Sequence, residues 1–125
     1  MTPRGLTVLL ADDDKVQTLM LSSLLRAKGY RVEAAFDATQ TFTSAIRTLP
    51  DVIVLDIQMP GGTGMLVLDR LKASTKTSQI PVIVLSGSTD PQADLSVRTR
   101  GADAFLSKPV DVDELLGTMA RLLGG

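Results

Sequence analysis

Acidic side chains stand where two strongly apolar segments of the sequence end. Asp56 follows the apolar run 52–55, and Asp12 and Asp13 follow the run 6–11. A run without alternating polar residues is typical of a strand that is covered on both faces, as in a parallel sheet. Ligands bind outside the carboxyl ends of the strands in such sheets. Although a single acid in this position can equally begin a turn, these acids are candidates for a common site.

Two more polar side chains follow predicted strands, Ser86 after 82–85 and Lys108 after 104–106. We therefore expect them to lie at the same edge of the sheet as the acids. Three carboxylates without histidine make an oxygen-only site that suits Mg²⁺ or Mn²⁺. A carboxylate beside such an ion can attack a phosphoryl group, while a lysine neutralises charge on the transferred oxygens. Ser86 can donate a hydrogen bond to those oxygens, and Gly87 leaves the approach open because it has no side chain.

The composition excludes several kinds of chemistry and partner. The sequence contains no histidine and no cysteine, which rules out Ser-His and Cys-His nucleophile pairs, histidine metal sites and disulfides. A net charge of −1 gives no basic surface of the kind that nucleic acid or an anionic membrane attracts. The first apolar run is too short for a signal peptide or a membrane span. We therefore expect a cytoplasmic protein that binds neither nucleic acid nor membrane directly.

Apolar runs alternate with helical patterns along the whole sequence. The expected strands are 6–11, 31–35, 52–55, 82–85 and 104–106, and the expected helices are about 15–28, 38–48, 65–71, 90–100 and 111–123. Such alternation predicts an α/β fold with a doubly wound parallel sheet, right-handed crossovers and helices on both faces. One domain over residues 1–125 is expected. The mixture of polar and apolar residues in the second strand places it at an edge of the sheet.

Local patterns mark the ends of several elements. Asp14 with Gln17, and Asp111 with Glu114, have the spacing of capping boxes at the starts of helices. The polar segment 74–79 is expected to be an exposed loop. Within the first helix, apolar residues recur at the helical spacing at Val16, Leu19, Met20 and Leu24. The predicted helix 90–100 has no clean apolar stripe.

Taken together, four motifs resemble the receiver domain of two-component response regulators, the family of the single-domain chemotaxis regulator. They are the acid pair at 12–13, the L-D-x-x-M-P-G-x-x-G loop at 55–64, the V-L-S-G sequence at 84–87, and the aromatic-x-x-K-P segment at 105–109. Each motif is weak alone, but the combination is specific and covers nearly the whole chain. The resemblance implies a flavodoxin-like (CheY-like) sheet in the strand order 2-1-3-4-5.

The resemblance also implies a role for each residue of the site. Asp56 would accept a phosphoryl group from a histidine kinase or a histidine phosphotransfer protein. Mg²⁺ would be held by Asp13, Asp56 and the backbone carbonyl of Gln58, with Asp12 acting largely through water. Lys108 would pair with the phosphoryl group. The domain would be a signalling switch that catalyses only its own phosphorylation and dephosphorylation.

Other residues would transmit or time the signal, according to the same resemblance. Ser86 and Phe105 correspond to the switch pair, although threonine is commoner at the first position and tyrosine is frequent at the second. Gln58 and Ser88 occupy positions that tune the lifetime of the phosphoryl group, and the bond before Pro109 would be cis. The output face would comprise the fourth helix, the fifth strand and the last helix, acting on an output partner or domain. The chain would be a monomer or a phosphorylation-linked dimer through that face.

Two other functions remain open from the sequence. Residues 9–16 also resemble the D-x-D-x-[TV] signature of haloacid-dehalogenase-type phosphatases, in which Asp12 would be the nucleophile and Asp14 the general acid and base. That function leaves Asp56 without a role, and 125 residues leave little room for a cap domain. The second alternative is a binding module that has the receiver fold but is regulated without phosphorylation.

Overall fold

The structure, a computed structural model, describes residues 5–59, 63–87 and 90–124. These residues form one five-stranded sheet in the order β2-β1-β3-β4-β5, with all neighbouring strands parallel. This confirms the predicted doubly wound α/β fold and its strand order 2-1-3-4-5. In chain order the elements are β1 (Thr7–Ala11), α1 (Lys15–Ala27), β2 (Arg31–Ala35), α2 (Ala38–Thr48), β3 (Val52–Asp56), α3 (Thr63–Ala73), β4 (Val82–Ser86), α4 (Pro91–Thr99), β5 (Ala104–Ser107) and α5 (Val112–Leu122).

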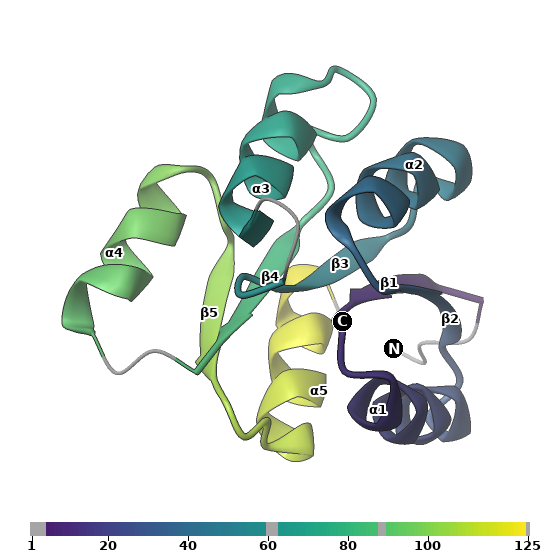
Figure 1. Ribbon diagram of the computed structural model, residues 1–125. Helices are drawn as coiled ribbons and strands as arrows, with labels where there is room; N and C mark the ends of the chain where they lie inside the picture. Colours follow the sequence, from purple (N-terminus) through teal and green to yellow (C-terminus); the bar gives the residue numbers. More distant parts are fainter. Residues whose placement is uncertain (1–4, 60–62, 88–89, 125) are drawn as a thin grey trace.

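The helices cover the sheet on both faces, with α2, α3 and α4 on one side and α1 and α5 on the other (Figure 1). Successive side chains of a strand point to opposite faces, so each central strand supplies two cores. Leu9, Ile53 and Val84 belong to the core under the first group of helices, and Leu10 and Leu85 belong to the core under the second. Every residue of β3 and β4 is buried. These strands lack alternating polar residues because both of their faces are buried, as the sequence indicated.

Aspartates begin four of the helices in the described part of the chain. Each side chain accepts a hydrogen bond from a backbone N–H in the first turn, which satisfies a donor that the helix itself leaves unpaired. The four pairs are Asp14 with Gln17, Asp37 with Gln40, Asp90 with Gln92, and Asp111 with Glu114. The predicted caps at Asp14 and Asp111 are confirmed. The predicted edge position of β2 and the range of α2 are confirmed as well.

Helix α1 buries a different face from the one that its apolar spacing marks. The residues at that spacing are exposed, at 69% for Val16, 65% for Leu19, 64% for Met20 and 47% for Leu24. The buried residues are Thr18, Leu21, Ser22 and Leu25. Apolar side chains occur on both faces of this helix, so spacing alone cannot select the face that packs on the sheet. Small Thr18 can face the sheet because its hydroxyl donates to the carbonyl of Asp14 at 2.8 Å.

The predicted loop 74–79 and the predicted helix 90–100 both form, and each shows a detail that the sequence pattern did not indicate. The predicted loop 74–79 is a loop, but one of its residues, Thr77, is fully buried and donates its hydroxyl hydrogen to the carbonyl of Leu71 at 2.6 Å. The segment 90–100 forms α4, in which Val97 is the one buried side chain among the described residues. A helix with so little buried surface needs no apolar stripe, which is why the pattern there was unclear.

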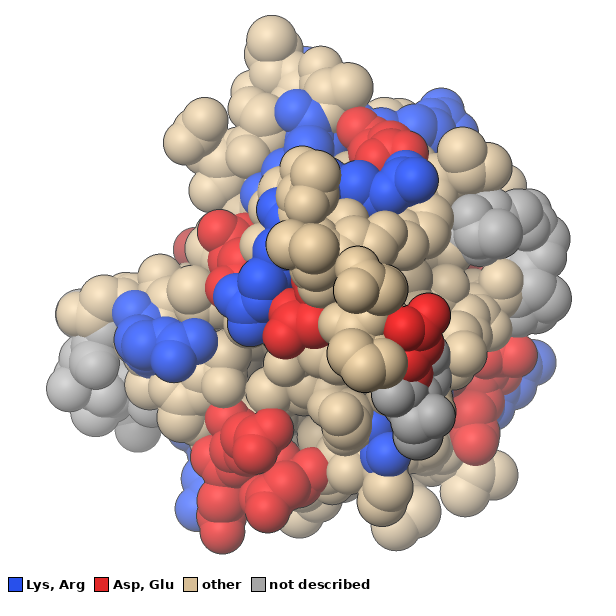
Figure 2. Space-filling model, turned by 90° about the vertical axis from the view of Figure 1, so that its left-hand side faces the viewer, with Lys and Arg blue, Asp and Glu red and all other residues tan. Residues whose placement is uncertain are grey.

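The surface carries mixed charge where it can be seen. On the side of the molecule on which α4 lies, acidic and basic side chains are interspersed (Figure 2). Ion pairs join Arg98 to Asp94 within α4 and Arg100 to Asp69 of α3. Among the described residues, no helix has both the length and the apolar character needed to cross a membrane.

Candidate functional site

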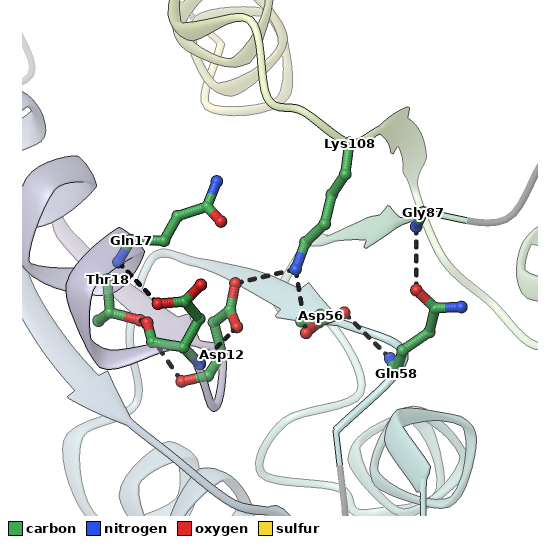
Figure 3. A network of polar contacts seen from close by, with 8 residues as sticks. Asp12, Gln17, Thr18, Asp56, Gln58, Gly87 and Lys108 are labelled. Carbon is green, nitrogen blue, oxygen red and sulfur yellow. Dashed lines mark hydrogen bonds and ion pairs between the residues drawn. The ribbon is translucent and has the colours of Figure 1, made fainter.

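The strand register brings the predicted site residues to one edge of the sheet. Asp56 pairs with Leu85, and Ser86 pairs with Ser107 in the neighbouring strand. The backbone N–H of Lys108 donates to the carbonyl of Ser86 at 2.8 Å, which ties the end of β5 to the end of β4. Because the strands end level with one another, the side chains that follow them meet in one cluster (Figure 3).

Three carboxylates form the centre of this cluster. Asp12, Asp13 and Asp56 each offer an oxygen, and these oxygens all lie within 4.8 Å of one another. Asp12 is 3% exposed and Asp56 is 2% exposed, whereas Asp13 lies open to solvent. Like charges at this separation repel, and hard oxygen donors are the ligands that Mg²⁺ prefers. The donor set therefore fits a magnesium ion that enters from the side of Asp13.

Lys108 bridges the two buried carboxylates. Its Nζ atom lies 3.1 Å from Asp12 Oδ2 and 3.1 Å from Asp56 Oδ2 (Figure 3). Burial lowers the pKa of Lys108, but its hydrogen bonds and charge interactions with both carboxylates outweigh this, and the pKa lies above its usual value. The ammonium group is therefore charged at neutral pH. It offsets part of the carboxylate charge and stays within reach of any group bound to Asp56.

Asp56 is held in place from two sides. The backbone N–H of Gln58 donates to Asp56 Oδ1 at 3.0 Å, while Lys108 contacts Oδ2. Burial raises the pKa of the Asp56 carboxyl, and the charge of Asp12 raises it further. The hydrogen bonds from Gln58 and Lys108 lower the pKa and so oppose this effect. One carboxylate is thus fixed in orientation beneath a positive charge, as a nucleophile requires.

Asp12 is held by Asp14 and by Thr18, of which the sequence pattern did not single out Thr18. The N–H of Asp14 donates to Asp12 Oδ1 at 2.9 Å. The hydroxyl of Thr18 lies 3.4 Å from the backbone carbonyl of Asp12 and 2.8 Å from that of Asp14. Helix α1 therefore anchors the loop that carries the acid pair. The signal for this role was a polar residue inside an apolar helix, and it could be interpreted only once the buried face was known.

The remaining predicted residues lie where the strand order places them. Ser86 is 1% exposed at the end of β4, and Phe105 is partly buried and packs against the core under α2, α3 and α4. The bond between Lys108 and Pro109 is cis.

Gln58 and Gly87 face each other across the mouth of the site (Figure 3). Ser88 and the loop residues 60–62 lie outside the described part of the chain.

Gly64 is the last residue of the motif at 55–64, and the structure shows why a side chain would not fit there. A Cβ atom added at Gly64 would lie 2.6 Å from Ile57 Cα and 2.7 Å from the carbonyl oxygen of Asp56. The N–H of Gly64 also donates to the carbonyl of Ile57 at 3.1 Å. The start of α3 thus packs directly on the backbone that carries Asp56, and a side chain there would displace it.

The comparison with protein families agrees with this geometry. Residues 8–120 match the response regulator receiver domain. The chain belongs to this family. Receiver domains take phosphate from histidine kinases and act on output domains, and they are signalling switches rather than enzymes that turn over an external substrate.

Curated relatives of this receiver domain include both short and long proteins. It is 31% identical over 118 residues to Protein PilH of Pseudomonas aeruginosa, covering 94% of this chain and 98% of the relative. It is 34% identical over 116 residues to the DNA-binding dual master transcriptional regulator RpaA of Synechocystis, covering 93% of this chain and 48% of the relative. The chain spans about half or less of the length of the longer relatives, such as RpaA and the response regulator PleD of Caulobacter vibrioides.

Solved structures share the fold of this receiver domain. A chemotaxis response regulator of Vibrio cholerae, CheY4, matches with a TM-score of 0.87 and 30% identity over 94% of this chain and 98% of that one. The receiver domain of a sensor histidine kinase from Pseudomonas aeruginosa matches with a TM-score of 0.87 and 29% identity, over 97% and 99% of the two chains. That structure is described with a magnesium ion coordinated in its active site cleft.

Proposed function

We propose that this receiver domain accepts a phosphoryl group on Asp56 from a histidine kinase or a histidine phosphotransfer protein. The observation that carries the proposal is the contact of one lysine with two buried carboxylates: Lys108 Nζ lies 3.1 Å from both Asp12 and Asp56. Placed between two acids, this lysine stays charged and oriented at the point where phosphoryl oxygens would lie.

The transfer is a displacement at phosphorus. An oxygen of the Asp56 carboxylate forms a bond to phosphorus while the bond from phosphorus to the donor breaks, and the electron pair stays with the donor. For a phosphohistidine the leaving group is an imidazole nitrogen, which takes a proton from solvent. The ammonium group of Lys108 can pair with the negatively charged phosphoryl oxygens, because it already contacts Asp56 Oδ2. Gln58 keeps the other carboxylate oxygen in place through its N–H.

Mg²⁺ is the cofactor that this site fits. Asp13, Asp56 and the backbone carbonyl of Gln58 would hold the ion, with Asp12 acting largely through water. When bound, the ion supplies positive charge that offsets the three carboxylates and the oxygens of the transferred group. The magnesium ion in the similar receiver domain from Pseudomonas aeruginosa supports this assignment.

The exposed apolar face of α1 is the surface that we assign to the phosphodonor protein. It consists of Val16, Leu19, Met20 and Leu24, which are 47–69% exposed. A groove of about 310 Å³ runs beside it, lined among others by Met20, Leu21, Val110 and Val112. The groove also includes Asp14, two residues from the buried acid Asp12. A helix of the donor that packs on this face would bring its histidine to the edge of the sheet, so the apolar face and the reacting carboxylate serve the same partner.

The output would leave through α4, β5 and α5. Val97 is the buried contact of α4 among its described residues, so this helix has little packing to resist a shift. Phe105 lies on the neighbouring strand and is partly buried. A charged group on Asp56 would give Ser86 a new acceptor, which couples the chemistry to this surface. The output is an effector protein or a further domain, and a phosphorylation-linked dimer through the same face is one form that it can take.

Intact mass spectrometry after incubation with acetyl phosphate and Mg²⁺ tests the function. We expect one added phosphoryl group that hydroxylamine and base remove, and no addition to Asp56→Asn. Equal phosphorylation of Asp56→Asn would overturn the assignment of Asp56. Loss confined to Asp12→Asn, together with hydrolysis of simple phosphate esters, would favour a phosphatase. A parent protein that gains no phosphoryl group from acetyl phosphate or from histidine kinases would favour a binding module.

A further inference from the structure

The side chain of Gln58 spans the mouth of the site from the end of β3 to the end of β4. Its Oε1 atom accepts a hydrogen bond from the backbone N–H of Gly87 at 3.0 Å (Figure 3). A Cβ atom added at Gly87 would lie 3.2 Å from the same Oε1. This contact is tighter than ordinary packing, so the missing side chain of Gly87 lets the carboxamide approach. The two residues are 29 positions apart in sequence and both are exposed.

The N–H of Gly87 is a donor in a position that a phosphoryl group can use. It follows Ser86, the last residue of β4, and β4 pairs with β3 directly at Asp56. A phosphoryl group on Asp56 carries three strong acceptor oxygens. Lys108 can supply one donor, and the remaining oxygens need others at the same edge of the sheet. A backbone N–H at the end of the adjacent strand costs nothing to orient, because the sheet already fixes its direction.

We propose that Gln58 is a built-in competitor for this donor, occupying the Gly87 N–H until a phosphoryl oxygen displaces it. The inference rests on the proposed function and adds a regulatory contact within the same site. A bond from an N–H to a neutral amide is weaker than a bond to a charged phosphoryl oxygen. Once it is in place, the phosphoryl oxygen therefore replaces the carboxamide oxygen as the acceptor of the Gly87 N–H. Before that, the bound carboxamide must leave, which lowers the affinity of the resting site for a phosphoryl group.

Displacement of Gln58 does not disturb the core. Its side chain is exposed, and the hydrogen bond that orients Asp56 comes from the backbone N–H of Gln58 rather than from the side chain. The carboxamide can therefore swing away while the backbone of the site keeps its shape. This separates the competing contact from the part of Gln58 that positions the nucleophile.

Beryllofluoride with Mg²⁺, a mimic of the bound phosphoryl group, provides the test. In Gln58→Met the side chain keeps its length but loses the acceptor. We expect the Gly87 amide proton to shift upfield in the free protein, and beryllofluoride to bind about two- to tenfold more tightly, the equilibrium effect of one neutral hydrogen bond. Gln58→Glu keeps an acceptor but adds negative charge beside the ligand, so it should bind more weakly than the parent.

Gln79→Met is the matched control, because Gln79 is exposed in the loop that precedes β4, at the amino ends of the strands rather than at the carboxyl ends that carry the site. It should change neither the Gly87 amide shift nor the affinity. If the parent binds beryllofluoride and Gln58→Met binds it no more tightly, the competition is overturned while the proposed function stands. If neither the parent nor any variant binds it in the presence of Mg²⁺, the proposed function fails and the inference fails with it.

Discussion

Gly64 approaches Ile57 so closely that a Cβ atom at position 64 would lie 2.6 Å from Ile57 Cα. Real Cβ atoms are not found at such a distance, so any side chain here must move one of the two segments. Ile57 joins Asp56, the proposed phosphoacceptor, to Gln58, whose N–H orients it. The contact therefore links the packing of α3 to the geometry of the site.

Gly64→Ala should damage the site and the fold together. Forcing a methyl group into a filled position costs about 1–3 kcal/mol, and we expect the free energy of unfolding to fall by that amount. Affinity for Mg²⁺ should fall as well, because the backbone of residues 56–58 moves. Gly117→Ala is the control, since nothing lies within 4 Å of a Cβ there. It should stabilise α5 by up to about 1 kcal/mol and leave Mg²⁺ affinity unchanged. Chemical denaturation and metal titration measure both effects, and an unperturbed Gly64→Ala would contradict the close approach.

Asp13→Asn should stabilise the metal-free protein. Lys108 contacts Asp12 and Asp56, whereas no ion pair joins Asp13 to a cation among the described residues, so Asp13 adds like charge to the cluster. Removing this charge should raise the free energy of unfolding by roughly 0.5 kcal/mol, the scale of an exposed charge interaction. Affinity for Mg²⁺ should fall at the same time.

Denaturant midpoints with and without Mg²⁺ measure the effect of Asp13→Asn. Glu33→Gln, on the exposed edge strand β2, is the control for loss of one negative charge. It should not alter the response to Mg²⁺. An Asp13→Asn protein that is less stable than the parent without metal would count against repulsion within the cluster.

Phosphotransfer from a protein donor should require the apolar face of α1, whereas phosphorylation by a small-molecule donor should not. We expect Leu19→Gln with Met20→Gln to slow phosphotransfer from a histidine kinase that phosphorylates the parent by tenfold or more, on the order of the loss of one interface anchor. Phosphorylation by acetyl phosphate should not change. Both side chains are more than 60% exposed, so the fold should tolerate the substitutions.

Leu95→Gln in α4 is the matched control for the α1 variant, because Leu95 is 61% exposed on another helix. It should leave transfer from the kinase unchanged. If the α1 variant lost phosphorylation by both donors, the effect would lie in the site rather than in docking. If it lost neither, the apolar face would not be the docking surface.

Phosphorylation should reach the output face through Ser86 and Phe105. A phosphoryl oxygen can accept a charge-assisted hydrogen bond from the Ser86 hydroxyl, worth about 1.5–3 kcal/mol. Inward movement of Ser86 would leave space for the Phe105 ring, and α4 has little core packing to oppose the change. Beryllofluoride with Mg²⁺ should therefore shift the NMR resonances of Leu95, Val97 and Phe105.

Ser86→Ala separates the switch from the binding of the ligand. It should keep the shifts at Asp13 and Asp56 but lose those at Val97 and Phe105. Shifts in the parent protein that stay confined to the carboxylates would refute the proposed coupling.

The sequence by itself determined the order of elements and the edge at which the site forms. Continuous apolar runs require strands buried on both faces, and helices between them require parallel pairing. Once the strands are parallel, the residues that follow them meet at one edge. The sequence alone therefore predicts that Asp12, Asp56, Ser86 and Lys108 lie together.

The tertiary structure decided which faces and which distant contacts were used. Helix α1 has apolar side chains on two faces, and only packing on the sheet showed that Thr18 and Ser22 turn inward while Leu19 turns outward. The close approach of Gly64 to Ile57 depends on how α3 is placed after β3. The hydrogen bond between Gln58 and Gly87 joins one residue that follows β3 to another that follows β4. Spacing in the sequence reports the period of a local element, but such contacts arise from how separate elements fit in space.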